Sequence, residues 1–166
     1  MKSFHECMTE YRQQLQKGTI QKAYRGLMEY MIHLKNYLKN KYPNHHISGN
    51  TYYGYMDMIY FSFTPESLKS KKLKIAIVFI HEKANFEVWL AGMNKEIQRK
   101  YWKLFRESFW NKYQIPADIK GIDSIVEHNL IEKPNFNDLD TLTRKIEDGV
   151  LIFTDDIKTF LHLNER

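Results

Sequence analysis

The fold is decided by residues 73–92, which read LKIAIVFIHEKANFEVWLAG. The first run, 73–81, is apolar and rich in β-branched residues, and a short turn at Lys83 and Ala84 leads into a second run from Phe86 to Gly92. Two such runs separated by a short turn predict a β-hairpin. We therefore expect residues 73–92 to form the centre of an antiparallel sheet.

The pairing that we expect in this hairpin places His81 opposite Phe86, and hence Ile80 beside Glu87. Successive side chains of a strand point to opposite faces of the sheet. The hairpin then carries two apolar sets, with Ile75, Ile77, Phe79, Val88 and Leu90 on one face and Ala76, Val78, Ile80, Trp89 and Ala91 on the other. Because both sets are apolar, we expect helices to cover both faces.

The segments on either side alternate between helical and strand patterns. Apolar residues recur every three or four positions in 3–17 and 20–42, with Gly18 between them, which predicts an antiparallel helical hairpin over 1–42. The aromatic stretch 51–63 predicts a first strand, so that 51–92 form a β-meander. Residues 94–114 predict a helix capped by Asn94, 122–131 a possible fourth strand, and 138–164 C-terminal helices that Gly149 could divide.

We predict a single α+β domain over residues 1–166. It has an N-terminal antiparallel helical hairpin, a central three- to four-stranded mainly antiparallel sheet, and C-terminal helices on the other face, in three layers. With 43% hydrophobic and 27% charged residues, the composition excludes disordered and fibrous proteins. No apolar run is long enough to cross a membrane, and the N-terminus does not resemble a signal peptide, so we expect a cytoplasmic protein without a membrane partner.

The charge is unevenly distributed along the chain. Residues 1–120 carry 20 Lys and Arg against 10 Asp and Glu, whereas residues 121–166 carry 5 against 10, which gives the net charge of +5. A basic body could meet an anionic partner, or the acidic tail could pack across the body and neutralise it. We favour the packed tail because its apolar residues keep a helical spacing.

Most motifs of catalysis and metal binding are missing. The chain has no glycine-rich phosphate loop and no GxSxG motif. His81-Glu82 begins like the zinc-protease HExxH, but Asn85 stands where the second histidine belongs. His45-His46 is expected in a solvated loop, and Cys7 on an apolar helix face is expected in the core. We therefore predict no metal site and no cofactor.

Asp57 is the most informative single residue. It is expected in the middle of a strand, where a carboxylate is costly unless it is paired or hydrogen-bonded. It could belong to an aromatic-lined pocket that recognises a small polar or cationic ligand, or it could be a structural carboxylate bonded to a tyrosine or an arginine. The candidate ligand-binding residues are Tyr53, Tyr55, Asp57, His81, Glu87 and Trp89.

A second set of candidates is basic. The residues that could bind a phosphate backbone are Lys71, Lys72, Lys74, Arg99, Lys103 and Arg106. This hypothesis requires them to share one face that the acidic tail leaves open. The predicted element order is similar to the αβββαβ order of restriction-endonuclease-like domains, but Trp89 stands where their catalytic lysine belongs, so any such domain would be degenerate.

Two runs resemble a known family. They are GYMDMIYFSFTP, residues 54–65, and LKIAIVFIHEKANFEVWLAGMNK, residues 73–95. Together they are similar to an uncharacterised family of small bacterial proteins described only as a domain of unknown function. The resemblance covers nearly the whole chain. It implies a bacterial cytoplasmic setting and brings no activity, cofactor or catalytic residue.

Our leading functional prediction is a non-catalytic binding or interaction module. Its site would be an aromatic-plus-carboxylate pocket on the first strand, around Tyr53, Tyr55 and Asp57. The first alternative is a nucleic-acid-associated protein, of which a degenerate restriction-endonuclease-like domain would be one form. The second is an enzyme that uses Asp57 as a general base with His81 or Glu87. We expect a monomer or a homodimer.

Overall fold

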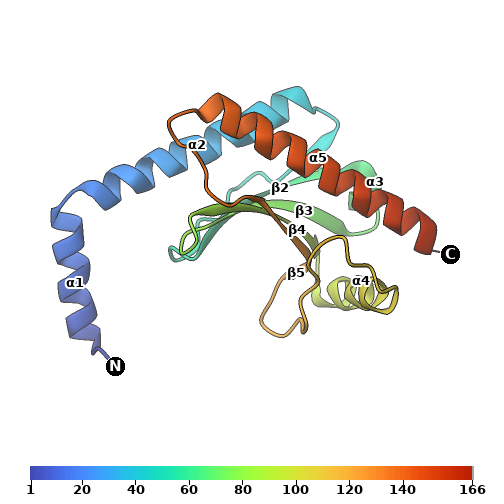
Figure 1. The fold of residues 1–166 in the computed structure, drawn as a ribbon, viewed down its shortest axis with the longest axis horizontal. Coiled ribbons are helices and arrows are strands. Elements are labelled where there is room, and N and C mark those ends of the chain that lie inside the picture. Colours follow the sequence, from blue (N-terminus) through green and yellow to red (C-terminus); the bar gives the residue numbers. More distant parts are fainter. Residues whose placement is uncertain (166) are drawn as a thin grey trace. The chain divides into compact units, whose positions relative to one another are not determined.

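The computed structural model describes residues 1–165 of the chain. It divides into two compact units, of which the first is Met1–Tyr37 and the second begins at Leu38. The five helices and the five-stranded antiparallel sheet confirm the α+β class that the sequence predicts (Figure 1). No helix in the described residues is both long enough and apolar enough to cross a lipid bilayer.

The first unit contains α1, Phe4–Gln16, and most of α2, Thr19–Lys41. Ser3 begins α1 with a capping box, since its hydroxyl accepts the Glu6 N–H while the Glu6 carboxylate accepts the Ser3 N–H. Gly18, with φ +74°, ends the helix. Both N-terminal helices are therefore confirmed.

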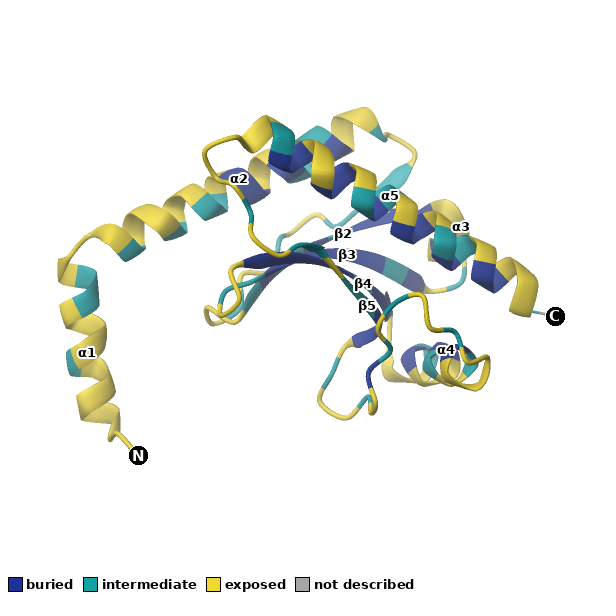
Figure 2. Cartoon of the chain, viewed as in Figure 1, coloured by how far each residue is buried: buried dark blue, intermediate teal, exposed yellow. Residues whose placement is uncertain are grey.

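The packing expected between these two helices is not found. The chain bends away at Gly18, so that α1 does not run back along α2 (Figure 1). Helix α1 buries none of its residues, and in Figure 2 it shows only the colours of exposed and intermediate residues. Phe4 is 82% exposed and Cys7 is also exposed, so the expectation of a core cysteine is wrong.

The sheet of the second unit is an antiparallel meander in the order β1-β2-β3-β4-β5. Its strands are β1 His45–Ile47, β2 Met58–Pro65, β3 Leu73–Ile80, β4 Asn85–Gly92 and β5 Ser124–Ile131. Strand β5 confirms the possible fourth strand at 122–131. Strand β1 falls where we expected a loop at His45-His46, and it is too short for alternation to reveal it; it pairs with the end of β2.

Strand β2 begins later than the sequence suggests. Gly54 and Met56 have φ values of +57° and +64°, and this left-handed backbone cannot continue a strand. Residues 51–57 therefore form a loop, in which Tyr52 alone makes an isolated bridge to Tyr60. The predicted position of Asp57 in the middle of a strand is wrong.

The central hairpin has the predicted faces but a different register. Phe79 pairs with Phe86 and Ile80 with Asn85, so the pairing is shifted from the expected one. The turn contains four residues, 81–84, and Ala84 takes φ +49° to close it. Because the shift amounts to two residues, every side chain keeps its predicted face.

The helices of this unit are α3 Glu66–Lys69, α4 Lys95–Glu107 and α5 Leu139–Asn164. Helix α4 begins at Asn94 as predicted but ends before 114, since Phe109 adopts φ +52° and is 90% exposed. Helix α5 is continuous through Gly149. A Cβ at this glycine would lie 2.6 Å from the Leu130 side chain, so glycine serves close packing there and does not break the helix.

The core lies between α5 and one face of the sheet. The side chains buried on this face include Ile59, Phe61, Ile77, Val88 and Val126, and α5 adds Ile146, Val150, Phe153 and Ile157. Figure 1 shows α5 along one side of the strands. On the opposite face Ala76 and Val78 are buried, but Tyr60, Ile80 and Trp89 are only partly covered. The helical cover expected on both faces is therefore only partly realised.

The acidic tail packs across the body, as its helical pattern suggested. Three carboxylates, two on α5 and one directly after it, each accept hydrogen bonds from a lysine and a tyrosine: Glu147 from Lys41 and Tyr42, Asp156 from Lys112 and Tyr113, and Glu165 from Lys71 and Tyr101. These contacts neutralise part of the positive charge of the first 120 residues.

Candidate functional site

The candidate site is a polar cavity of about 530 Å³ at the β3–β4 turn and along β4 and β5. We call it the Glu87 pocket. The charged and amide side chains that line it include Lys83, Asn85, Glu87, Glu127, Glu132 and Lys133. Three carboxylates thus face two ammonium groups, and the pocket carries an excess of acceptors.

Glu87 is the centre of this pocket. It is 7% exposed, which is rare for a carboxylate. Its Oε2 accepts the Trp89 indole N–H at 2.8 Å, and its Oε1 accepts the Asn85 amide at 3.2 Å. The Lys83 ammonium lies 3.3 Å from Oε1 and is itself largely exposed. Glu87 is therefore held in place by two neutral donors and reached by one exposed surface cation.

Asn85 supplies a second acceptor. Its side-chain nitrogen is committed to Glu87, which leaves Oδ1 as the remaining hydrogen-bonding group. This oxygen is buried and has no hydrogen-bond partner within residues 1–165. A buried carbonyl without a donor costs about 1–3 kcal/mol, so a ligand that donates to it would recover this free energy.

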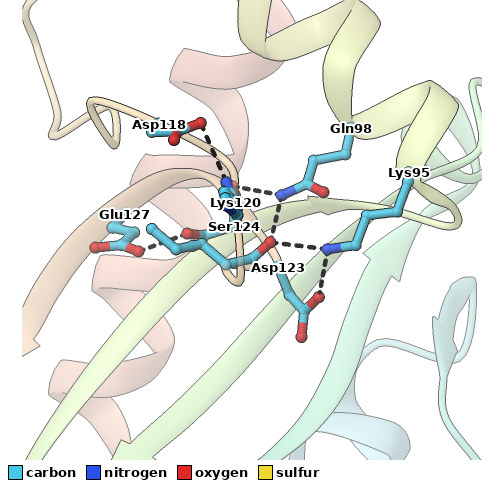
Figure 3. Close-up of polar contacts among 8 residues, drawn as sticks. Lys95, Gln98, Asp118, Lys120, Asp123, Ser124 and Glu127 are labelled. Carbon is cyan, nitrogen blue, oxygen red and sulfur yellow. Dashed lines mark hydrogen bonds and ion pairs between the residues drawn. The ribbon is translucent and has the colours of Figure 1, made fainter.

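Glu127 borders the same pocket from β5. It pairs with Trp89 across the sheet, and its backbone exchanges two hydrogen bonds with Gln114. Its carboxylate accepts the hydroxyl of Ser124, which Figure 3 shows at the start of β5. This contact leaves the other carboxylate oxygen of Glu127 available for further donors.

Alternation along β4 explains how these side chains meet. Asn85, Glu87 and Trp89 occupy every second position, so they share one face of the sheet. This is the face that α5 does not cover. The sequence prediction included Glu87 and Trp89, and it missed Asn85, although the same alternation could have identified it.

The three residues of the predicted first-strand site lie elsewhere. Tyr53 and Tyr55 are exposed in the loop before β2, and Tyr55 is 95% exposed. The Asp57 carboxylate is also exposed and accepts the Tyr55 N–H at 2.9 Å. Hydrogen bonds from the backbone N–H groups of Tyr55 and Met58 lower the pKa of Asp57, which makes it a weaker base. None of the three lines the Glu87 pocket.

His81 lies next to Asp57 rather than next to Glu87. Its backbone N–H donates to the Asp57 carbonyl at 3.0 Å, and its ring packs edge-on against Phe79. Burial lowers the pKa of His81, although the charge of Asp57 opposes this shift. The general-base hypothesis requires Asp57 and a partner, His81 or Glu87, to line one cavity. The Glu87 pocket contains neither Asp57 nor His81.

The six basic candidates do not form one surface. Lys71 is ion-paired with Glu165 of the tail, and the Lys74 ammonium lies over the Tyr60 ring. Lys72 occupies a left-handed turn before β3. Only the α4 residues Arg99, Lys103 and Arg106 lie on the same helix. The full set required by the nucleic-acid hypothesis is thus divided, and part of it is neutralised.

The pocket does not resemble a metal centre. Among the residues that the structure describes, no group of three or more His, Cys, Asp or Glu side chains is placed to hold a metal ion. Its carboxylates are instead arranged to accept hydrogen bonds. The chemistry that the geometry offers is recognition of a donor-rich group.

Comparison with known proteins identifies a family and nothing beyond it. Residues 4–161 match a family described as Domain of unknown function (DUF7000). No curated protein and no solved structure gives a significant match. The family match confirms the resemblance carried by residues 54–65 and 73–95, whereas similarity to restriction-endonuclease-like domains finds no support. The chain belongs to the DUF7000 family of domains of unknown function.

Proposed function

We propose that the protein is a binding module that recognises a small cationic molecule in the Glu87 pocket. The observation that carries this proposal is the buried Glu87 carboxylate, which lies on an incompletely covered sheet face and borders a cavity. A buried carboxylate is costly unless cations or donors compensate its charge. A ligand with an ammonium or guanidinium group would provide that compensation.

Lys83 indicates what kind of group fits. Its ammonium reaches Glu87 Oε1 at 3.3 Å from a turn, while 65% of its side chain is exposed. Because most of the Lys83 side chain is exposed, its ammonium can return to water when a ligand takes its place. The ammonium of the ligand would then take the place that the Lys83 ammonium now occupies.

The neighbours of Glu87 would add specificity. Asn85 Oδ1 offers an acceptor for a second N–H of the ligand, and Glu127 offers a second carboxylate. Trp89 orients Glu87 through its indole N–H and does not line the cavity. The site proposed here differs from the aromatic-plus-carboxylate pocket expected around Tyr53, Tyr55 and Asp57, because its aromatic residue positions the carboxylate and lies outside the cavity.

The experiment is calorimetric titration with putrescine, agmatine and guanidinium, with glutarate as an anionic comparison. We expect the cations to bind and glutarate not to bind. Glu87→Gln keeps the shape but removes the charge. A hydrogen bond to a charged group contributes about 1.5–3 kcal/mol, so this variant should bind the cations about 10–100-fold more weakly.

Glu82→Gln is the matched control, because Glu82 is an exposed carboxylate in the adjacent turn and does not line the pocket. It should bind like the wild-type protein. The proposal is wrong if none of the cations binds, or if the Glu82 and Glu87 variants lose affinity equally.

A further inference from the structure

A second cavity, of opposite charge, lies beside α4. It has a volume of about 500 Å³ and is lined chiefly by Lys95, Arg99, Trp102 and Lys103 of α4 and by Ile119 and Lys120 of the following loop. We call it the basic groove. Asp118 is the single acidic residue among its lining groups.

Helical spacing gathers these cations. Lys95, Arg99 and Lys103 are separated by four residues each, so they follow one side of α4. The loop brings Lys120 to the same groove. Asp118 is already engaged, because its carboxylate accepts the Lys120 backbone N–H at 3.2 Å (Figure 3).

One of the four cations is neutralised and three are not. The Lys95 ammonium donates to the Ile122 carbonyl at 2.9 Å and to Asp123 at 3.0 Å, as Figure 3 shows. Arg99, Lys103 and Lys120 have no ion pair with any residue in 1–165. The groove therefore concentrates positive charge that the acidic tail leaves uncompensated.

Trp102 adds an aromatic surface in a fixed orientation. Its indole N–H donates to the Pro116 carbonyl at 2.8 Å, and the Arg106 guanidinium lies 5.3 Å from its ring centroid. The residue is half-buried and borders the groove. Aromatic rings beside cations are the arrangement on which nucleic-acid bases stack while their phosphates are neutralised.

We infer that the basic groove binds the phosphate and base of a nucleotide unit, either as a free nucleotide or within a single strand. Arg99, Lys103 and Lys120 contact the phosphates, and Trp102 stacks on the base. This site is independent of the Glu87 pocket, and it uses two of the six basic residues that the sequence singled out, Arg99 and Lys103.

The test is fluorescence anisotropy of fluorescein-labelled 12-mers of thymidylate and uridylate, titrated with salt. Three phosphate contacts on a single strand give a slope of about −2 in log K against log salt concentration. Arg99→Gln with Lys103→Gln should reduce this slope by about 1.4 and weaken binding at low salt. Unlabelled ATP then distinguishes the two sources, since it displaces the 12-mer if the site takes a free nucleotide and fails to do so if it needs a strand.

Two controls make the result specific. Arg144→Gln with Lys145→Gln removes the same two charges from an exposed part of α5 and should leave the slope unchanged. Trp102→Leu should weaken the 12-mers while leaving the salt slope as in the wild-type protein. Glu87→Gln should have no effect, so the two proposals fail or succeed separately.

Three outcomes would overturn this inference. The first is no anisotropy change for either 12-mer at 50 mM salt. The second is an equal loss of binding affinity in both double variants, which would mean that the strand binds to the general positive charge of the surface. The third is displacement by polyglutamate as effective as by unlabelled 12-mer, which would indicate an acidic peptide site.

Discussion

At the scale of single residues, Gly92 shows how closely two backbones approach. It ends β4, where the chain turns towards α4. A Cβ at this position would lie 2.6 Å from the Gln98 backbone nitrogen and 3.0 Å from the Asn94 carbonyl oxygen. Backbone atoms cannot move aside as a flexible side chain can, so glycine is required here by space rather than by its φ angle.

We predict that Gly92→Ala destabilises the protein by about 1–3 kcal/mol through this overpacking. Gly49→Ala is the matched control, because no atom lies within 4 Å of a Cβ there and the φ angle of Gly49 is not positive. It should be neutral or stabilising by about 0.4–1 kcal/mol. Urea denaturation of both variants measures the difference, and equal midpoints would contradict the close approach.

Residue by residue, the sequence was informative where alternation applies and misleading where the backbone departs from a strand. Glu87 and Trp89 lie on one face of the sheet as the alternation predicts, because alternation survives a register shift of two. Asp57 was misplaced because the left-handed φ angles of Gly54 and Met56 interrupt the aromatic stretch. Composition does not reveal such angles, particularly at a methionine.

At the scale of elements, α5 is held to the body by two of its own carboxylates, Glu147 and Asp156, and by Glu165 directly after it. Burial alone would raise the pKa of Asp156, but hydrogen bonds from Lys112 and Tyr113 outweigh it and lower the pKa below its usual value. The folded-state pKa is therefore below that of the unfolded chain. The ionised Asp156 carboxylate therefore stabilises the fold fully above the unfolded-state pKa of about 3.9. This stabilisation is lost as the pH falls through the folded-state pKa.

We predict that Asp156→Asn costs about 1.5–3 kcal/mol at pH 7, because a charged acceptor is lost. The difference from the wild-type protein should shrink as the pH is lowered below about 4, where Asp156 of the unfolded chain binds a proton, and disappear below the lower pKa of Asp156 in the folded protein. Asp155→Asn is the neighbouring control. Its carboxylate is 74% exposed and pairs with Lys158, so the change should cost less than about 1 kcal/mol. Guanidinium denaturation at pH 7 and pH 3 measures the free energy of unfolding of each protein. The same difference between Asp156→Asn and the wild-type protein at both pH values would contradict an ionised Asp156.

The number of helices in the tail could not be derived from the pattern. Gly149 signals a helix break in isolation, and its actual role depends on Leu130 in β5, which lies close against it in space. The sequence pattern likewise places the end of α4 too late, because it continues through the aromatic residues Trp110 and Tyr113. Both residues follow the helix and still reach the core, where Trp110 packs on Phe160 and Tyr113 on Phe153. Both errors arise from tertiary contacts that local spacing does not contain.

At the scale of the whole molecule, burial is concentrated in the second unit. Helix α1 carries the apolar side chains Phe4, Met8 and Tyr11, and each is more than 40% exposed. An isolated helix of 13 residues is marginal in water, and its capping box contributes locally. The apolar pattern of α1 predicted a packed helix, whereas its exposure gives it no share in the core.

We therefore predict that removing residues 1–16 shifts the midpoint of thermal unfolding by less than about 2 °C, because less than about 1 kcal/mol of packing is lost. Differential scanning calorimetry of the full and shortened chains provides the measurement. A fall of 5 °C or more would mean that α1 is packed in solution. The Asp156→Asn change in the shortened chain should have the same effect as in the full chain.

The contacts of α5 also constrain how this helix can move. Glu147 and Asp156 are nine positions apart on the helix, which corresponds to about two and a half helical turns, and Glu165 follows directly after its last residue. Glu147 and Asp156 therefore emerge from opposite sides of the helix, and Glu165 anchors the residue after its end. Any roll of α5 about its own axis that relieves one anchor strains the next, so the helix is locked against rotation as well as sliding. The long C-terminal helix can leave the sheet only by detaching as a whole.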